Sequence, residues 1–123
     1  MNHLKSGKKF HRKRDARRAL IRNLMADLVL RSRIRTSLAK AKEVRSSLEK
    51  LITIAKKQNI SALRRLKADL PEKAANKVYY ELALLYKNRP GGYLRIIKTG
   101  ERKIKDGSSL AILELIKEET AEK

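Results

Sequence analysis

The most constraining feature of this sequence is the stretch Lys5–Arg22, in which half of the residues are lysine or arginine. It contains no run of apolar side chains before Ala19-Leu20-Ile21, so its first part cannot form a hydrophobic core. A segment of this kind repels itself and buries too little apolar area to offset the entropy lost on ordering. We therefore expect residues 1–14 to be a basic extended N-terminal arm that lies against a densely negative partner.

Charge is distributed unevenly along the rest of the chain. The 123 residues include 32 Lys and Arg against 13 Asp and Glu, a net charge of +19. The first 45 residues hold fifteen basic and three acidic side chains, whereas residues 118–123 contain three glutamates and one lysine. Such asymmetry is typical of a basic arm that binds nucleic acid. The length predicts one domain, so we assign residues 15–117 to a single domain and residues 118–123 to a frayed acidic tail.

Periodicity along this domain predicts an α+β fold. Helical spacing and turn residues predict four helices, at about 15–30, 39–57, 61–68 and 72–86. Alternating or β-branched residues predict three strands, at 33–36, 93–99 and 110–116, with Gly100 ending the second. The third is nearly apolar on both faces and is expected to lie centrally. We expect a small three-stranded mixed sheet covered on one face by about four helices.

Two of the predicted helices have informative faces. In the first, Leu20, Ile21, Leu24, Met25 and Leu28 share one face, and Arg14, Arg17 and Arg18 continue the same azimuth towards its start. The same part of a helix face cannot be both buried in the core and highly charged. We therefore expect the second half of this helix to pack on the body and the arginine-bearing first half to project beyond it into the ligand. In the last helix, the expected core-facing residues are Ala75, Val78, Tyr79, Leu82, Leu85 and Tyr86.

The sequence lacks the residues that several classes of protein function require. The sequence has no cysteine, and therefore no thiolate metal site or thiol nucleophile. Both histidines, His3 and His11, fall in the arm, and no carboxylates cluster in a pattern suited to two metals. Gly91-Gly92 lacks the Lys and Ser/Thr of a phosphate-binding loop. No apolar run approaches the length of a membrane span. We expect no enzyme, no cofactor, no metal site, no small-molecule substrate and no membrane association.

The charge pattern favours contacts to the phosphates of a polynucleotide, with bound counterions released as each lysine or arginine docks. The first candidate contacts are the cations of the arm and of the start of the first helix: Lys5, Lys8, Lys9, Arg12, Lys13, Arg14, Arg17, Arg18 and Arg22. The second group lies further along the chain: Arg33, Arg35, Lys40, Lys42, Arg45, Arg95 and Lys98.

Four blocks of sequence resemble one known family, in the same order and over nearly the whole chain. They are His3–Phe10 with Arg17–Leu24, Ile34–Thr36 with Lys40–Arg45, Glu49–Thr53 with Ala55-Lys56, and Gly91–Ile96 with Lys98, Gly100, Arg102 and Ala111–Leu115. Together these blocks resemble the bacterial-type large-subunit ribosomal protein seventeen family. Asp15-Ala16 departs from the family pattern, which usually has a small hydroxyl residue and a histidine there. The segment 61–76 matches in pattern more than in identity.

The resemblance implies a structural constituent of the large ribosomal subunit in the cytoplasm. It also implies binding to large-subunit ribosomal RNA, a basic extension that reaches into that RNA, and neighbouring large-subunit ribosomal proteins as partners. Two other classes compete with this interpretation. A nucleoid-type DNA-binding protein would share the composition, and an enzyme acting on nucleic acid would share the basic surface but lacks candidate catalytic groups.

Overall fold

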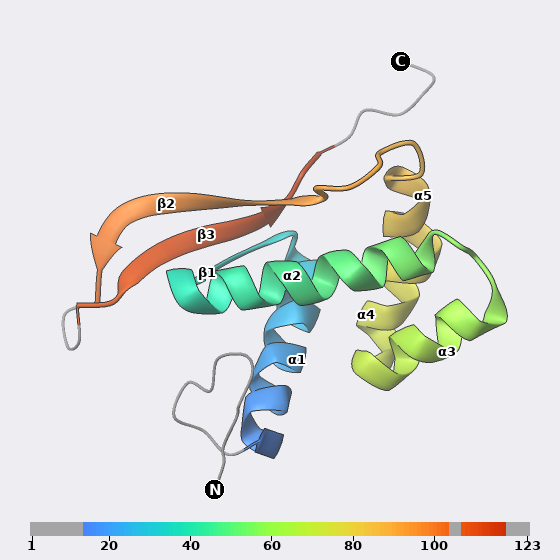
Figure 1. Cartoon of the computed structure of the whole chain (residues 1–123), viewed down its shortest axis with the longest axis horizontal. Helices are drawn as coiled ribbons and strands as arrows, with labels where there is room; N and C mark the ends of the chain where they lie inside the picture. Colours follow the sequence, from blue (N-terminus) through green and yellow to red (C-terminus); the bar gives the residue numbers. More distant parts are fainter. Residues whose placement is uncertain (1–13, 104–106, 118–123) are drawn as a thin grey trace, which may run out of the picture.

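The computed structural model describes residues 14–103 and 107–117, drawn in colour in Figure 1. The expectations for the arm up to Lys13, and for the tail from Glu118, therefore lie outside the described residues. The elements, in chain order, are α1 (Arg14–Arg31), β1 (Arg33–Ser37), α2 (Leu38–Ala55), α3 (Ile60–Asp69), α4 (Glu72–Lys77), the π-helical turn η1 (Val78–Leu82), α5 (Ala83–Leu85), β2 (Leu94–Arg102) and β3 (Ser109–Leu115). The α+β class and the three strands are confirmed.

The sheet has the order β1-β3-β2, which confirms the central position of the last strand. Both pairings are antiparallel, so the expectation of a mixed sheet is wrong. The reason lies in the strand order. β1 and β2 run in the same direction, but β3 lies between them, and each hydrogen-bonds only to this oppositely directed neighbour. Figure 1 shows β2 and β3 as a long twisted hairpin that reaches past the first turn of α2.

The core forms between this sheet and α2. The register aligns Ile34, Leu113 and Ile96 across the three strands, and these side chains pack into the buried cluster. On α2 the buried stripe follows the predicted helical period, with Ala41, Val44, Leu48 and Ile52 all inaccessible to solvent. Such burial is the main contribution to stability in a domain of this size.

Local capping fixes where α2 begins. The Ser37 side chain accepts a hydrogen bond from the Lys40 backbone N–H at 3.3 Å, so the last residue of β1 is also the helix N-cap. This direct passage from strand to helix orients the first turns of α2, and with them Lys40 and Lys42.

None of the helices in the described ranges is long and apolar enough to cross a membrane.

Tyrosine side chains join the far end of α2 to the sheet. The Lys56 ammonium group donates to the Tyr93 hydroxyl at 2.9 Å and to the Arg89 carbonyl at 2.5 Å. The Tyr93 ring stands 5.2 Å from that of Tyr86, whose hydroxyl donates to the Ile116 carbonyl at 2.5 Å. Tyr86 and Tyr93 are buried, so the loop between the last helix and β2 is pinned to the body.

The last helical segment differs from its prediction because of the π-helical turn. The expected single helix is observed as α4, η1 and α5 in succession, and the extra residue in a π turn rotates the subsequent side chains by about 100° around the helix axis. Tyr86 remains buried and Ala83 becomes buried as well, whereas Leu85 turns outward and is 38% exposed. The prediction that Leu85 lies in the core is therefore wrong.

Gly100 does not end β2, as the sequence had suggested. The strand continues to Arg102, and its pairing with β3 shifts between Lys98 and Arg102. Gly100 has a φ of +80°, which glycine adopts without the steric cost that other residues carry. The residue therefore forms an irregularity within a longer hairpin, which carries the basic side chains of Arg102 and Lys103 towards its tip.

Candidate nucleic-acid interface

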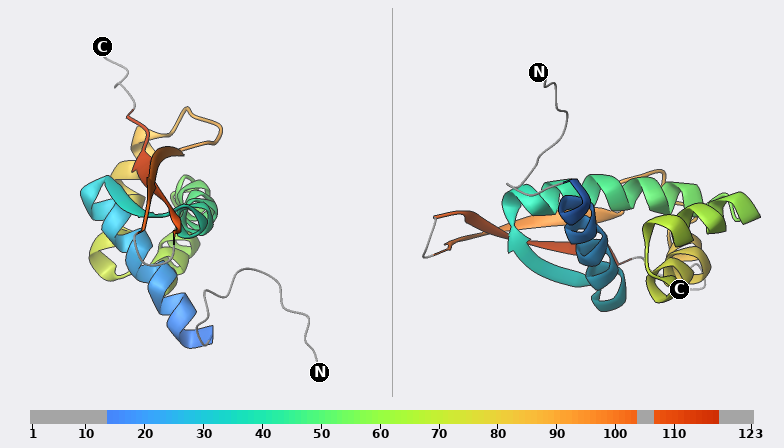
Figure 2. Two further views of the ribbon diagram at one scale, coloured as in Figure 1. Left: turned by 90° about the vertical axis from the view of Figure 1, so that its left-hand side faces the viewer. Right: turned by 90° about the horizontal axis from the view of Figure 1, so that it is seen from below.

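The first half of α1 carries an exposed row of arginines. Arg14, Arg18 and Arg22 are spaced four residues apart, so their side chains lie along one side of the helix, and all three are exposed. Burial of α1 begins at Ile21 and continues through Met25 and Leu28. Figure 2 shows the first turns of α1 running out beyond the body, as the sequence predicted. Arg14, which we predicted to be the last residue of the N-terminal arm, is instead the first residue of this helix.

Arg17 is an exception to this projecting row. It lies four residues before Ile21 on the docked side of α1, and its guanidinium group meets the Glu43 carboxylate on α2 at 3.2 Å. The Arg17 side chain is only 23% exposed, and its Nε atom is buried without a hydrogen-bond partner among the described residues. The expectation that Arg17 projects with Arg14 and Arg18 is therefore wrong. The side of α1 that packs on α2 extends one turn further towards the start of the helix, where α2 supplies the carboxylate of Glu43.

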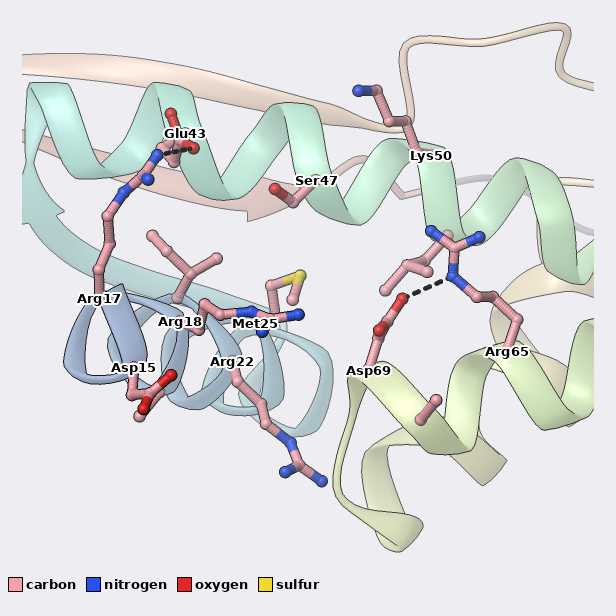
Figure 3. Close-up of a pocket in the computed structure, with 14 residues that line it drawn as sticks. Asp15, Arg17, Arg18, Arg22, Met25, Glu43, Ser47, Lys50, Arg65 and Asp69 are labelled. Carbon is pink, nitrogen blue, oxygen red and sulfur yellow. Dashed lines mark hydrogen bonds and ion pairs between the residues drawn. The ribbon is translucent and has the colours of Figure 1, made fainter. Parts of the chain in front are cut away.

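A cleft of about 660 Å³ opens between α1, α2 and α3, beside this ion pair (Figure 3). Its basic lining residues are Arg17, Arg18, Arg22, Lys50 and Arg65, and its acidic ones are Asp15, Glu43 and Asp69. Two of these three carboxylates are already engaged, Glu43 by Arg17 and Asp69 by Arg65 at 2.8 Å.

Three cations of this cleft remain available for a ligand. Within the described ranges, Arg18, Arg22 and Lys50 make no ion pair with any carboxylate. Figure 3 shows Arg18 extending from α1 towards α3, whereas the Lys50 ammonium group, at the edge of the cleft on α2, points away from it. The cleft therefore has unpaired positive charge from two helices along its edges, beside the first turns of α1.

The second predicted group is spread over three places. Lys42 and Arg45 are exposed and Lys40 is half-buried in the first turns of α2, next to the projecting half of α1. Lys98 is exposed on β2. Arg33, Arg35 and Arg95 lie instead on the sheet, on the face opposite Ile34 and Ile96, and each is ion-paired with a glutamate. None of the seven residues of this second group lines the cleft.

The same part of the chain shows no cluster of metal ligands. No group of three His, Cys, Asp or Glu side chains placed to hold a metal ion occurs among residues 14–103 and 107–117. The chemistry that the cleft offers is neutralisation of anionic groups by guanidinium and ammonium donors.

Comparison with known proteins gives a consistent result. A family model described as "Ribosomal protein L17" matches residues 20–116. The chain is 44% identical over 117 residues to "Large ribosomal subunit protein bL17" of Sulfurihydrogenibium sp. (strain YO3AOP1), which covers 94% of this chain and 97% of the relative. The protein of the same name from Thermus thermophilus is 42% identical over 117 residues, covering 94% and 99%. The chain belongs to the ribosomal protein L17 family.

Membership of the L17 family confirms the resemblance seen in the sequence blocks. This is a family of ribosomal structural proteins and not of enzymes. The family model begins at Leu20, so Arg14, Arg17 and Arg18 precede the matched region, whereas Arg22, Lys50 and Arg65 fall within it.

Sequence reasoning missed two residues of the cleft in this L17 chain. Lys50 lies off the buried stripe of α2, and Arg65 is an exposed residue of α3, and neither was among the predicted contacts. Periodicity identifies both as surface residues, but their presence in one cleft with Arg18 and Arg22 depends on how α1, α2 and α3 pack together. No local sequence signal reports that packing.

Proposed function

We propose that this chain is a structural constituent of the large ribosomal subunit, in the cytoplasm, and binds folded large-subunit ribosomal RNA through phosphate contacts. Family membership supports the first statement, and neighbouring large-subunit proteins are further partners on the same ground. The single observation that supports the RNA contact is that three cations, Arg18, Arg22 and Lys50, line one cleft beside the first turns of α1 and are not paired with a carboxylate among the described residues.

The geometry suits a folded polynucleotide better than a small anion. The cleft is an open space between helices, and the cations around it stand on different elements. A chain of phosphates that runs along this surface can meet Arg18 and Arg22 on α1, and Lys50 on α2. Each such contact releases a condensed counterion, and Arg can bridge two phosphate oxygens. Recognition of this kind responds to the shape of an RNA surface more than to base sequence.

The proposal predicts a preference for folded RNA over duplex DNA. Folded large-subunit ribosomal RNA and random duplex DNA should compete for the labelled protein at the same salt concentration, and the RNA should retain most of it. Nonspecific phosphate binding alone would treat the two polyanions similarly. Equal binding, or a preference for the duplex, would contradict the proposal, and a preference for the duplex would favour a nucleoid-type DNA-binding protein. Competition by filter retention or by electrophoretic mobility measures this ratio.

A further inference from the structure

The sheet has a second surface that the cleft does not explain, on the face opposite the core. We call it the open face, and its residues are Arg33, Arg35, Arg95, Ile97, Ile112 and Glu114. The strand register arranges them in two rows, Arg33-Glu114-Arg95 and Arg35-Ile112-Ile97. None of these six side chains belongs to the buried cluster. The cleft is lined entirely by α1, α2 and α3, so the open face is a separate surface.

The arginines of the open face are paired with carboxylates of the same sheet, one on the face and one at its edge. Glu114 is shared by Arg95 at 2.6 Å and Arg33 at 3.8 Å, and Arg35 is paired with Glu101. The Glu114 side chain is 15% exposed, so its carboxylate lies below the two guanidinium groups and holds them over the sheet. In a chain of net charge +19, three arginines here meet two glutamates. This near balance contrasts with the unpaired cations of the cleft.

Apolar side chains occupy the rest of this surface. Ile97 is 38% exposed, and Ile112 beside it is half-buried. Beyond the row of Arg33, Glu114 and Arg95 lies a groove of about 600 Å³, whose lining also includes Leu85 and Ile116. Leu85 is one of the large apolar residues that the π-helical turn leaves exposed. The open face and its groove therefore place apolar groups on both sides of a row of ion pairs.

We infer that the open face docks a neighbouring protein whose contact segment presents apolar side chains flanked by carboxylates. Protein interfaces combine a desolvated apolar centre with a polar rim and are enriched in arginine. A phosphodiester backbone offers no apolar group to cover Ile97, and the fixed carboxylate of Glu114 repels phosphate. No exposed aromatic ring lies on this face for a base to stack on. The partner's carboxylates would meet the outer donors of Arg33, Arg35 and Arg95, which are more than half exposed.

This inference rests on the proposed function, because it places the chain within the large subunit. A photoreactive benzophenone amino acid at position 97, in chain assembled into large subunits, tests it directly. The expected adduct joins this chain to another polypeptide and survives ribonuclease treatment. The same probe at position 18 should give an adduct that ribonuclease removes. An RNA adduct at position 97, or no adduct there while position 18 reacts, would overturn the inference. Failure at position 18 together with absence from the subunit would instead contradict the proposed function.

A second test uses a substitution that should weaken docking to a protein partner without weakening RNA binding. Ile97→Lys adds a cation, so it should leave binding to protein-free ribosomal RNA unchanged or slightly stronger. It should also speed dissociation from assembled subunits at least tenfold, because the charge enters the apolar centre of a protein interface. Leu84→Lys is the matched control, since Leu84 is exposed but lies outside the open face and its groove. Dissociation of Ile97→Lys no faster than that of Leu84→Lys would overturn the inference.

Discussion

Replacing Arg14, Arg18 and Arg22 together by glutamine weakens binding to large-subunit ribosomal RNA by about a hundredfold near 0.1 M salt, if each arginine neutralises one phosphate. The plot of log affinity against log salt concentration also becomes shallower by about two to three units. All three side chains are exposed, so folding is expected to be unaffected. A salt titration of RNA binding, with circular dichroism to confirm the fold, measures both effects.

A charge-matched variant separates this row from the general positive field of the chain. Lys57, Lys73 and Lys87 are also exposed, and none lines the cleft. Their joint replacement by glutamine removes the same net charge and should change the salt slope by less than one unit. If the two triple variants lose affinity and slope equally, the arginine row of α1 has no special role.

Leu48→Ala is expected to lower the free energy of unfolding by about 2–5 kcal/mol, the largest stability effect that we predict for a single substitution. Leu48 is fully buried on α2, in the core between this helix and the sheet, and truncation leaves a cavity that neighbours only partly fill. This loss is a large fraction of the total stability of an ordinary small domain. Urea unfolding of the RNA-free protein, monitored by circular dichroism, measures it.

Leu84→Ala provides the matched control for this prediction. The chemical change is the same, but Leu84 is 57% exposed, so the unfolding free energy should change by less than about 0.5 kcal/mol. Equal losses from the two substitutions would show that the core is not centred on α2.

Local chemistry explains why much of this fold could be predicted from the sequence. The alternation of Arg33, Ile34, Arg35 and Thr36 correctly separated the two faces of β1, because strand side chains alternate whatever the surrounding fold. The apolar stripe of α2 and its Ser37 cap result from helical period and hydrogen bonding within one turn. For the same reason, the exposure of Arg14, Arg18 and Arg22 was accessible from sequence alone.

The failures share a different cause, since each depends on contacts between distant segments. Arg17 is drawn onto the body by Glu43, which lies 26 residues away, and no local pattern specifies that pair. The π-helical turn rotates Leu85 outward, which a uniform helical period cannot anticipate. Lys50 lines the same cleft as Arg18 only because α1 packs against α2. The sequence therefore predicted which residues are charged surface, but not how they are grouped.

Sedimentation of the tagged protein from cell lysate tests the central proposal most directly. The account predicts that the chain sediments with the large ribosomal subunit at low salt and is progressively released as salt is raised, because its attachment depends on phosphate neutralisation. Absence from the large-subunit fraction at low salt would contradict the account.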